Sequence, residues 1–462
     1  MKLTILGGGG FRTPFVWQAL IRDQASPRVT EVSLHDVDQV RLTVIHAILD
    51  SLAQESGAID PPTLSITTDA REALSGADFV FAAVRAGGPE GRSLDEHVAL
   101  DLGVIGQETT GPGGLAYALR SVPVMLDYAR IIAEVAPRAY VMNFTNPAGI
   151  VTEAMQSILG DRVLGICDTP SGMGRRIVLA AGADPEATEV AYDYIGLNHL
   201  GWMRRVLVDG VDVLPGVLAD GAALEDLEEA HVFGADWLRT LGVVPNEYLY
   251  YYDRQREALA SITSALASGE PTRGDFLVTQ QEDFYAAAAA DLPGALDRWR
   301  ATVAEREASY MAEATGGTQG APAYARGVET DPSKQGYAGV ALAVMAAIAR
   351  GEQSTLILNV RNGDAIPGMP SDAVVEVSCL VDGSGVHPLV QAAPSLAQLG
   401  LMLRVKAVER HIIAAVATRS RREAELAFAE HPLVDSVVVA KELLAQYEAV
   451  HPAIAGLWSD HV

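Results

Sequence analysis

The stretch that decides the fold is Met1–Pro14, MKLTILGGGGFRTP, in which a short apolar run leads directly into four glycines. The apolar residues at 2–6 predict a β-strand. Glycines directly after a strand let the backbone approach a dinucleotide pyrophosphate at the start of the next helix. Arg12 or Thr13 stands where a third glycine is usual, and a plain tight turn is the alternative explanation. The opening predicts the first strand and the phosphate loop of a dinucleotide-binding fold.

Strand and helix continue to alternate as far as about residue 165. Further strands are predicted at 31–34, 79–83, 140–143 and 163–166, each followed by a helical period. This order predicts an α/β fold with a Rossmann-type, doubly wound parallel sheet. We therefore expect an NAD-binding Rossmann domain over residues 1–165.

The rhythm changes in residues 166–462, which predict a mixed α+β domain with substrate, metal and oligomerisation contacts. We expect the whole chain to have a lactate/malate dehydrogenase-like architecture. A strand end is expected at 192–199, hairpins at 205–213 and 374–386, and helices at 293–313, 339–350, 396–418 and 421–429. The Gly- and Pro-rich segment 315–332 predicts a loop.

The composition predicts a folded, acidic protein. Of 462 residues 49% are hydrophobic, and 59 acidic against 34 basic side chains leave a formal net charge of −25. This charge repels phosphate backbones and anionic lipid surfaces, so we expect no nucleic acid or membrane partner. The two cysteines form no CxxC pattern, and the apolar stretch 339–349 is shorter than the about 20 residues that cross a bilayer. With no signal-peptide pattern at the start, we expect a cytoplasmic location.

Asp36 provides a second cofactor signal, because it ends the second predicted strand in the run LHDVD. A carboxylate there accepts hydrogen bonds from the ribose diol of NAD and repels the extra phosphate of NADP. Capping of the next helix is the alternative role. NAD is the predicted cofactor, and its predicted contacts are Asp36, Asn143, Phe11 and the glycines Gly7, Gly8, Gly9 and Gly10.

Two candidate metal ligands occur beyond the first region. Cys167 lies in CDTP directly after a predicted strand, and His199 lies in GLNHLGW. A thiolate and an imidazole that meet near a nicotinamide predict a divalent cation with open positions for substrate oxygens. Taken singly, a buried cysteine is usually a small apolar residue and a lone histidine a core or surface residue, so both explanations stay open.

Polar residues after the strands predict a substrate site, because the carboxyl ends of parallel strands share one edge. Arg85 and Arg92, in VRAGGPEGR, offer guanidinium groups suited to phosphate. Asn146, in NFTNPAG, offers an amide to sugar hydroxyls or serves in a turn. Glu108, in GQETTGPGG, orients a metal-bound water or a substrate hydroxyl, or is a solvated loop carboxylate. The tyrosine run at 248–252 is packing or, near a cation and an arginine, supplies a base.

With these residues assembled, the chain resembles glycoside hydrolase family 4, the NAD- and metal-dependent 6-phosphoglycosidases and α-glycosidases. The resemblance covers most of the chain. Its motifs are GGGGFRTP, GQETTGPGG, NFTNPAG, CDTP, GLNHLGW, YLYYY, RNGDAIPGMPSDAVVEVSC and GVHPL. The resemblance implies Mn²⁺ or another divalent metal on Cys167 and His199, substrate contacts on Arg92 and Asn146, and a base at Tyr248.

Two positions depart from the family pattern. Asp168 is an acid near the glycosidic oxygen in some members, whereas many β-specific members have Asn there, so both anomers stay open. Arg273 corresponds only loosely to a further substrate arginine, because its surroundings, TRGDFLVTQQEDF, differ from the usual pattern.

The resemblance implies hydrolysis of 6-phospho-β-glucosides, with a phosphorylated disaccharide or glucoside as substrate and a homodimer or homotetramer as the assembly. In this mechanism NAD⁺ takes a hydride from C3 of the sugar, and the metal polarises the resulting ketone. A base then removes the C2 proton, and the glycosidic oxygen leaves by elimination. Finally water adds at C1, and NADH returns the hydride to C3. The alternatives are a 6-phospho-α-glucosidase or α-glycosidase of the same family, an NAD-dependent 2-hydroxy-acid dehydrogenase, and a non-catalytic nucleotide sensor.

Overall fold

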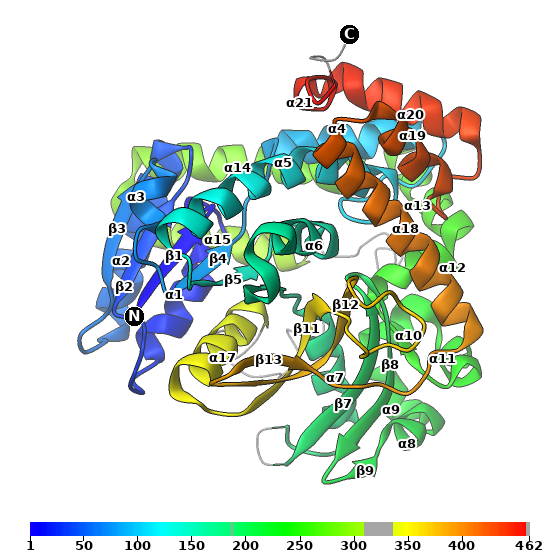
Figure 1. Ribbon diagram of the computed structural model, residues 1–462, viewed down its shortest axis with the longest axis horizontal. Helices are drawn as coiled ribbons and strands as arrows, with labels where there is room; N and C mark the ends of the chain where they lie inside the picture. The colour runs from blue at the N-terminus through cyan, green and yellow to red at the C-terminus, as the bar shows by residue number, and fades with distance from the viewer. Residues whose placement is uncertain (186–187, 309–335, 459–462) are drawn as a thin grey trace.

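One mixed sheet runs through the molecule (Figure 1). A computed structural model describes residues 1–185, 188–308 and 336–458, so the loop predicted at 315–332 lies outside the described residues. The strands follow the order β10-β8-β7-β12-β11-β6-β5-β4-β1-β2-β3, with β9 beside β8 and β13 beside β12. Their bounds are β1 Lys2–Leu6, β2 Glu31–His35, β3 Thr63–Thr67, β4 Phe79–Ala82, β5 Tyr140–Asn143, β6 Val163–Gly165, β7 Val190–Leu197, β8 Leu200–Val208, β9 Val211–Asp212, β10 Val244–Pro245, β11 Ser354–Arg361, β12 Val374–Asp382 and β13 Gly385–Pro388.

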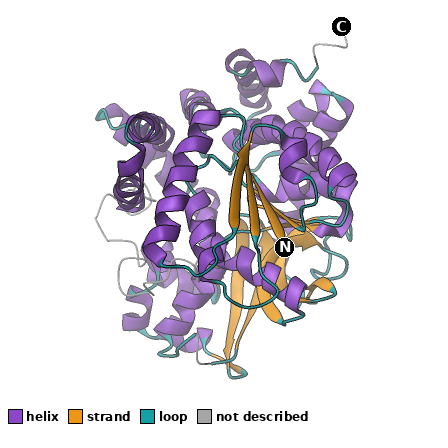
Figure 2. Cartoon of the chain, turned by 90° about the vertical axis from the view of Figure 1, so that its left-hand side faces the viewer, coloured by secondary structure: helices purple, strands orange, loops and turns teal. Residues whose placement is uncertain are grey.

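The parallel half of the sheet, β3-β2-β1-β4-β5-β6, is the predicted Rossmann-type arrangement. The five predicted strands agree with the structure to within one residue at each end. Their apolar runs are buried on both faces because helices cover both sides of a parallel sheet (Figure 2). The edge strand β3 is missing from the prediction, since its residues are only partly buried or exposed and form no apolar run.

The antiparallel half, β11-β12-β7-β8-β10, joins the parallel half where Asn359 of β11 pairs with Gly165 of β6. A Cβ at position 165 would lie 2.7 Å from Thr152 Oγ1 and 2.8 Å from Asn359 Cβ, so the junction requires glycine. Both predicted hairpins are confirmed as β8-β9 and β12-β13, although β8 begins at Leu200, earlier than predicted. The strand expected to end at 199 is β7.

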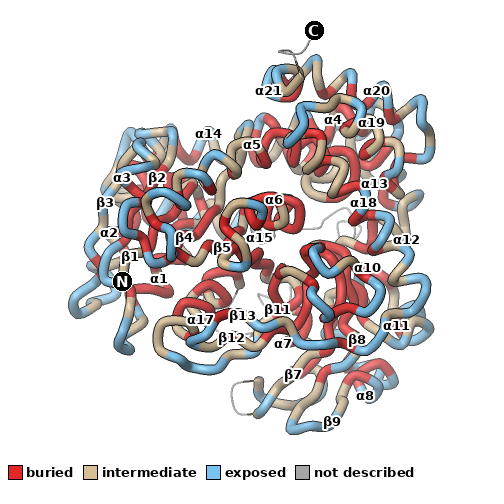
Figure 3. Tube along the Cα trace, in the orientation of Figure 1, coloured by how far each residue is buried: buried red, intermediate tan, exposed pale blue. Residues whose placement is uncertain are grey.

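Helices cover both faces of the sheet (Figure 2). Buried residues lie mainly in the middle of the molecule and exposed ones at its periphery (Figure 3). In the first half of the chain they are α1 Thr13–Arg22, α2 Gln39–Ser56, α3 Ala70–Leu74, α4 Gly88–Asp101, α5 Pro112–Val135, α6 Ala148–Leu159, α7 Thr169–Ala180, α8 Leu214–Ala219, α9 Gly221–Glu225 and α10 Glu228–Phe233. They continue with α11 Ala235–Leu241, α12 Tyr250–Asp253, α13 Gln255–Ala267, α14 Arg273–Ala290, α15 Ala295–Ala308, α17 Gly336–Arg350, α18 Leu396–Thr418, α19 Arg421–Glu430, α20 Val437–Val450 and α21 Pro452–Ala455. Within the described ranges, no helix is long and apolar enough to cross a membrane.

The two regions expected from the sequence share their cores. One apolar cluster contains Leu3 of β1 together with Val377 of β12, and a second contains α5 and α6 together with α18, α19 and α20. The C-terminal helices therefore cover the Rossmann-type half, although they lie far from it in the sequence (Figure 1). The predicted division after residue 165 coincides in space with the change from parallel to antiparallel strands within one sheet.

Candidate active site

A cavity of about 1000 Å³ lies where the parallel strands end, and residues of both halves of the sheet line it. Most of the residues predicted for the site meet there. They are Gly7, Gly10, Phe11, Asp36, Arg85, Arg92, Glu108, Asn146, Cys167, Asp168, His199, Tyr248 and Arg273. Gly8, Gly9 and Asn143 are absent from this lining, so their predicted contacts with the cofactor stay predictions.

The glycine turn is held from outside by three aromatic side chains that no sequence pattern connects with it. Gly7 has φ 78°, and a Cβ there would lie 2.4 Å from the Ala83 carbonyl oxygen. Residues of α14, α15 and α17 donate to carbonyl oxygens of the turn. These bonds are Tyr285 Oη to Gly9 (2.7 Å), Trp299 Nε1 to Phe11 (2.9 Å) and Tyr337 Oη to Arg12 (3.1 Å). The C-terminal region therefore fixes the shape of the N-terminal turn.

Asp36 stands at the cavity wall and does not cap the next helix. Its Oδ2 accepts from the Gly9 amide at 3.1 Å and its Oδ1 from the Asp38 amide at 3.1 Å. The cap of α2 is Asp38, whose Oδ1 accepts from Val40 and Arg41. The alternative explanation of Asp36 as a helix cap is therefore wrong.

Asn143 is fully buried and shapes the turn after β5. Its Nδ2 donates to Thr152 Oγ1 at 3.1 Å and to the Thr145 carbonyl oxygen at 3.2 Å. Of the two asparagines in the NFTNPAG motif, Asn146 lines the cavity and Asn143 does not. Asn143 thus positions the segment that carries Asn146.

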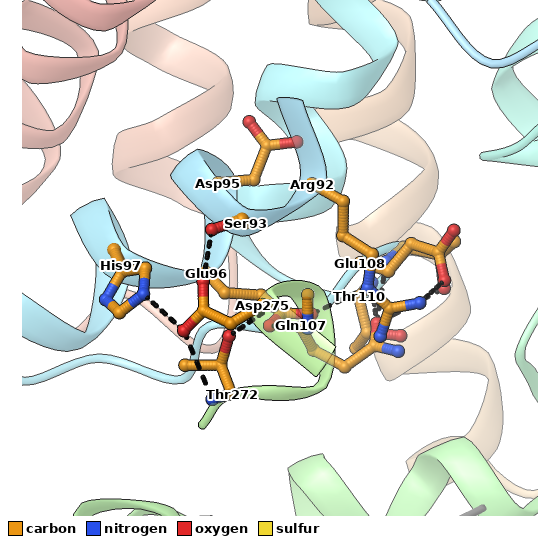
Figure 4. Close-up of polar contacts among 12 residues, drawn as sticks. Arg92, Ser93, Asp95, Glu96, His97, Gln107, Glu108, Thr110, Thr272 and Asp275 are labelled. Atoms are coloured by element: carbon orange, nitrogen blue, oxygen red, sulfur yellow. Dashed lines mark hydrogen bonds and ion pairs between the residues drawn. The ribbon is translucent and has the colours of Figure 1, made fainter. Parts of the chain in front are cut away.

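Glu108 lies between two arginines. Arg92 donates to its carboxylate at 2.5 Å (Figure 4). Arg85 forms an ion pair with the other oxygen. Burial opposes ionisation of Glu108, but Arg85 and Arg92 outweigh it and hold the pKa of Glu108 well below its usual range. Glu108 is therefore a paired, ionised carboxylate, and its interpretation as a solvated loop residue is wrong.

The start of α14 packs against α4, which carries Arg92 (Figure 4). Glu96 accepts from Arg92 Nε at 2.7 Å and from the Gly274 amide at 2.7 Å. Asp275 accepts from Ser93 at 2.5 Å. These contacts bring Arg273, the first residue of α14, to the cavity that holds Arg92.

Positive charge is concentrated in this part of the cavity. Burial, followed by repulsion from Arg12, Arg273 and Arg85, lowers the pKa of Arg306 well below its usual range. Arg306 lies near the end of α15 in the run AEREA, which has the pattern of an ordinary charged helix surface and carried no signal in the sequence. In a chain with a net charge of −25, such crowding of arginines favours an anionic ligand.

Cys167 and His199 are both buried at the cavity, with 5% and 8% of their surface exposed. His199 has φ 62°, its Nδ1 lies 2.8 Å from Thr109 Oγ1, and its ring stacks on Tyr248 with 3.9 Å between centroids. Engagement of Nδ1 leaves Nε2 as the nitrogen for a ligand. Thr109 belongs to the GQETTGPGG motif, and this motif is the sequence feature from which a role for Thr109 in the site could have been predicted.

The chemistry of these two side chains fits a divalent cation. Burial lowers the pKa of His199 to about 4, so its imidazole is neutral near pH 7 and able to coordinate. Burial, then the charges of Glu376 and Asp168, raise the pKa of the Cys167 thiol, so a nearby cation would be needed to stabilise its thiolate. Within the described ranges no group of three or more His, Cys, Asp or Glu side chains could hold a metal. A cation here would take its other ligands from substrate or water.

A buried carboxylate that the sequence did not indicate, Glu376, lies close to Cys167 and to the residue before His199. Glu376 of β12 accepts from Asn359 at 2.8 Å, from Tyr194 at 3.1 Å and from Asn198 at 3.4 Å. Burial raises its pKa to about 7. Because Asn198 precedes His199, Glu376 supports the turn that presents the histidine.

Comparison with known proteins identifies the family. Residues 2–182 match the family model described as family 4 glycosyl hydrolase, and residues 194–434 match that of the family 4 glycosyl hydrolase C-terminal domain. The chain belongs to glycosyl hydrolase family 4. This confirms the predicted family and shows that the protein is a glycosidase.

Family 4 relatives of similar length cover nearly the whole chain. A probable 6-phospho-β-glucosidase of Bacillus subtilis is 30% identical over 98% of this chain and 97% of its own, and a 6-phospho-β-glucosidase of Escherichia coli shows the same identity and coverage. The solved structure of the Thermotoga maritima 6-phospho-β-glucosidase with NAD and glucose-6-phosphate matches with a TM-score of 0.80, at 26% identity over 97% and 98% of the two chains. A 6-phospho-α-glucosidase from gut microorganisms, in complex with NAD and Mn²⁺, matches with a TM-score of 0.78, at 27% identity over 98% of each chain. The predicted fold class is confirmed.

Proposed function

We propose that this family 4 glycosidase hydrolyses 6-phospho-β-glucosides with NAD and a divalent cation such as Mn²⁺. The observation that supports this most strongly is the crowding of arginines in the same cavity as the glycine turn and the Cys167–His199 pair. A sugar phosphate matches the arginines, and a dinucleotide matches the turn. Relatives named as 6-phospho-β-glucosidases agree with this assignment.

The cofactors would be held by residues already described. Gly7, Gly10, Phe11 and Asp36 would contact NAD, whereas Cys167 and His199 would hold the metal. When bound, NAD supplies a reversible hydride acceptor and the cation supplies Lewis acidity. Neutral His199 and buried Cys167 provide one nitrogen and one sulfur donor.

The arginines and amides of the chain would orient the sugar. Arg85, Arg92 and Arg273 bind the 6-phosphate, and Asn146 donates to a sugar hydroxyl. Glu108 aligns Arg85 and Arg92 and offers an oxygen to the substrate. Such alignment before binding lowers the entropic cost of reaching the reactive geometry.

Tyr248 and Asp168 would move protons. Tyr248 takes the C2 proton of the sugar, since stacking on His199 fixes its ring and Arg92 lies within electrostatic reach of its phenol. Asp168 lies between Cys167 and the start of α7, and gives a proton to the departing glycosidic oxygen.

The test is hydrolysis of a chromogenic 6-phospho-β-glucoside with NAD⁺ and Mn²⁺. We expect turnover to stop when both are withdrawn and to return when they are restored. The unphosphorylated glucoside serves as control and should react about 100-fold more slowly, because it lacks the charged hydrogen bonds between the phosphate and the arginines. Undiminished turnover after removal of both cofactors would contradict the proposal.

A 6-phospho-α-glucosidase is the second candidate. Asp168 stands where many β-specific members of the family have Asn, and a 6-phospho-α-glucosidase structure also matches the whole chain. Comparing kcat/KM for the α and β anomers of one 6-phosphoglucoside decides between the two.

We also propose a cytoplasmic homodimer or homotetramer. Two free, buried cysteines agree with a reducing compartment. Light scattering coupled to size-exclusion chromatography measures the assembly directly.

A further inference from the structure

A second polar group lines the same cavity, away from the arginines that surround Glu108. Arg176 of α7 approaches Glu228 of α10, with Nη1 3.5 Å from Oε2, and also pairs with Glu229. The nearby charges that act on Arg176 most strongly are Glu229, Glu228 and Glu247. By contrast, the charges that act most strongly on Arg306 are the arginines of the other group.

The order of the strands places this group beyond the candidate metal. The glycine turn follows β1, Arg85 follows β4 and Cys167 follows β6, so these residues succeed one another along the edge of the sheet. Helix α7 packs on β8, further along in the antiparallel half (Figure 1). Glu247 connects this part to the Cys167 segment, because it accepts from Thr169 Oγ1 at 3.3 Å.

The group is built for a ligand with hydrogen-bonding atoms. Arg176 lines the cavity, and its Nε is buried and lacks a hydrogen-bond partner among the described residues. Glu228 lines the same cavity. The side chains of Arg176 and Glu228 are 10% and 16% exposed, so both are largely withdrawn from water. A hydroxyl group donates to the Glu228 carboxylate and accepts from the Arg176 guanidinium, whereas an apolar ligand offers neither of them a hydrogen-bonding atom.

We infer that Arg176 and Glu228 bind the leaving group and select one that carries hydroxyl groups, such as a second sugar, over an aromatic one. The inference rests on the proposed function. The leaving group is bonded to ring carbon C1, whereas the phosphate is carried by C6, which is bonded to ring carbon C5. A substrate whose phosphate lies among the arginines therefore projects its leaving group from a different ring carbon. Arg176 and Glu228 line the same cavity as Cys167 and Tyr248, and the helix that carries Arg176 packs on β8 in the antiparallel half.

The test compares two substrates that differ only in the leaving group. They are a 6-phospho-β-glucosyl-glucose and 4-nitrophenyl 6-phospho-β-glucoside, each measured with NAD⁺ and Mn²⁺. In Glu228→Gln we expect kcat/KM for the disaccharide to fall about tenfold more than for the aryl substrate, mainly through KM, because one charged hydrogen bond is weakened. Glu228→Asp keeps the charge and should recover part of the lost selectivity. Arg176 is left intact because its removal would strand the buried Glu229.

Glu225→Gln is the matched control, because Glu225 is exposed on α9 and does not line the cavity. It should leave both substrates unchanged. Equal losses on the two substrates in Glu228→Gln, or no loss on either, would overturn the inference while leaving the proposed function intact. Failure of the unaltered protein to hydrolyse either substrate would instead overturn the proposed function, and the inference with it.

Discussion

The parallel and antiparallel halves of the sheet contribute to the site in different ways. In the parallel half several predicted residues follow a strand within two residues, as Asp36 follows β2 and Cys167 follows β6. In the antiparallel half β12 pairs with β7, which comes from a distant part of the chain. The residues there act together only after the sheet has formed. We therefore assign cofactor binding mainly to the parallel half, and expect the chemistry to depend on both halves.

The largest effect is expected from removing the sulfur donor Cys167, which should abolish metal-dependent chemistry and leave NAD binding by the parallel half intact. Cys167→Ser replaces the proposed soft ligand by a poor one, so we expect the Mn²⁺-dependent activity to fall at least about 100-fold. Affinity for NAD, measured by calorimetry, should change less than twofold, because the glycine turn and Asp36 are untouched.

Cys379 provides the matched control for that experiment. It is buried in β12, away from the cavity lining, and Cys379→Ala should cost about 1 kcal/mol of stability without changing the metal dependence. Full activity in Cys167→Ser, or loss of NAD binding there, would contradict the division between cofactor binding and chemistry.

Glu376 should make the antiparallel half sensitive to pH. Its pKa is raised to about 7 by burial, against about 4.3 in an unfolded chain. Between these values the folded protein holds a proton that the unfolded chain has lost, so the free energy of unfolding falls as the pH rises. We expect Glu376 to remove about 2–3 kcal/mol between pH 5 and pH 8.

Urea unfolding of Glu376→Gln at pH 5 and pH 8 measures this contribution. The variant stays neutral, so its stability should fall less than that of the unaltered protein over this range. Glu225→Gln, at an exposed position, should keep the original pH dependence. An identical pH dependence in Glu376→Gln would show that the buried carboxylate does not titrate in this range.

The smallest effect is expected at the cap of α14, which comes late in the chain but packs on the Rossmann-type half. Thr272 accepts from the Asp275 amide at 3.1 Å, and Asp275 accepts from the Thr272 amide at 3.3 Å. Thr272→Ala should cost about 1 kcal/mol of stability and raise KM about twofold to fivefold, since Arg273 loses its fixed position. Ser395→Ala removes the cap of α18 and should cost similar stability with KM unchanged. Equal KM values in the two variants would argue against a substrate role for Arg273.

Local patterns explain which parts of the site could be predicted. The glycine turn, Asp36 and Cys167 each follow an apolar strand within a few residues, and that spacing is visible in the sequence. His199 and Tyr248 were recognised through family motifs, and the structure brings their rings to 3.9 Å. Arg306 could not be predicted from the sequence, because an arginine on a charged helix has no distinguishing pattern and only its neighbours in space show that it lies at the site.

The strand–turn–helix units, the cofactor turn and the family can be predicted from local sequence patterns, because these depend on residue types a few positions apart. The contacts of Glu376 with Asn198 and Asn359 emerge only when the chain has folded. The same holds for the bonds from Tyr285, Trp299 and Tyr337 to the glycine turn. These contacts join residues far apart in the chain. They follow from the order of strands in the sheet and from the packing of late helices on early ones, which no local periodicity records.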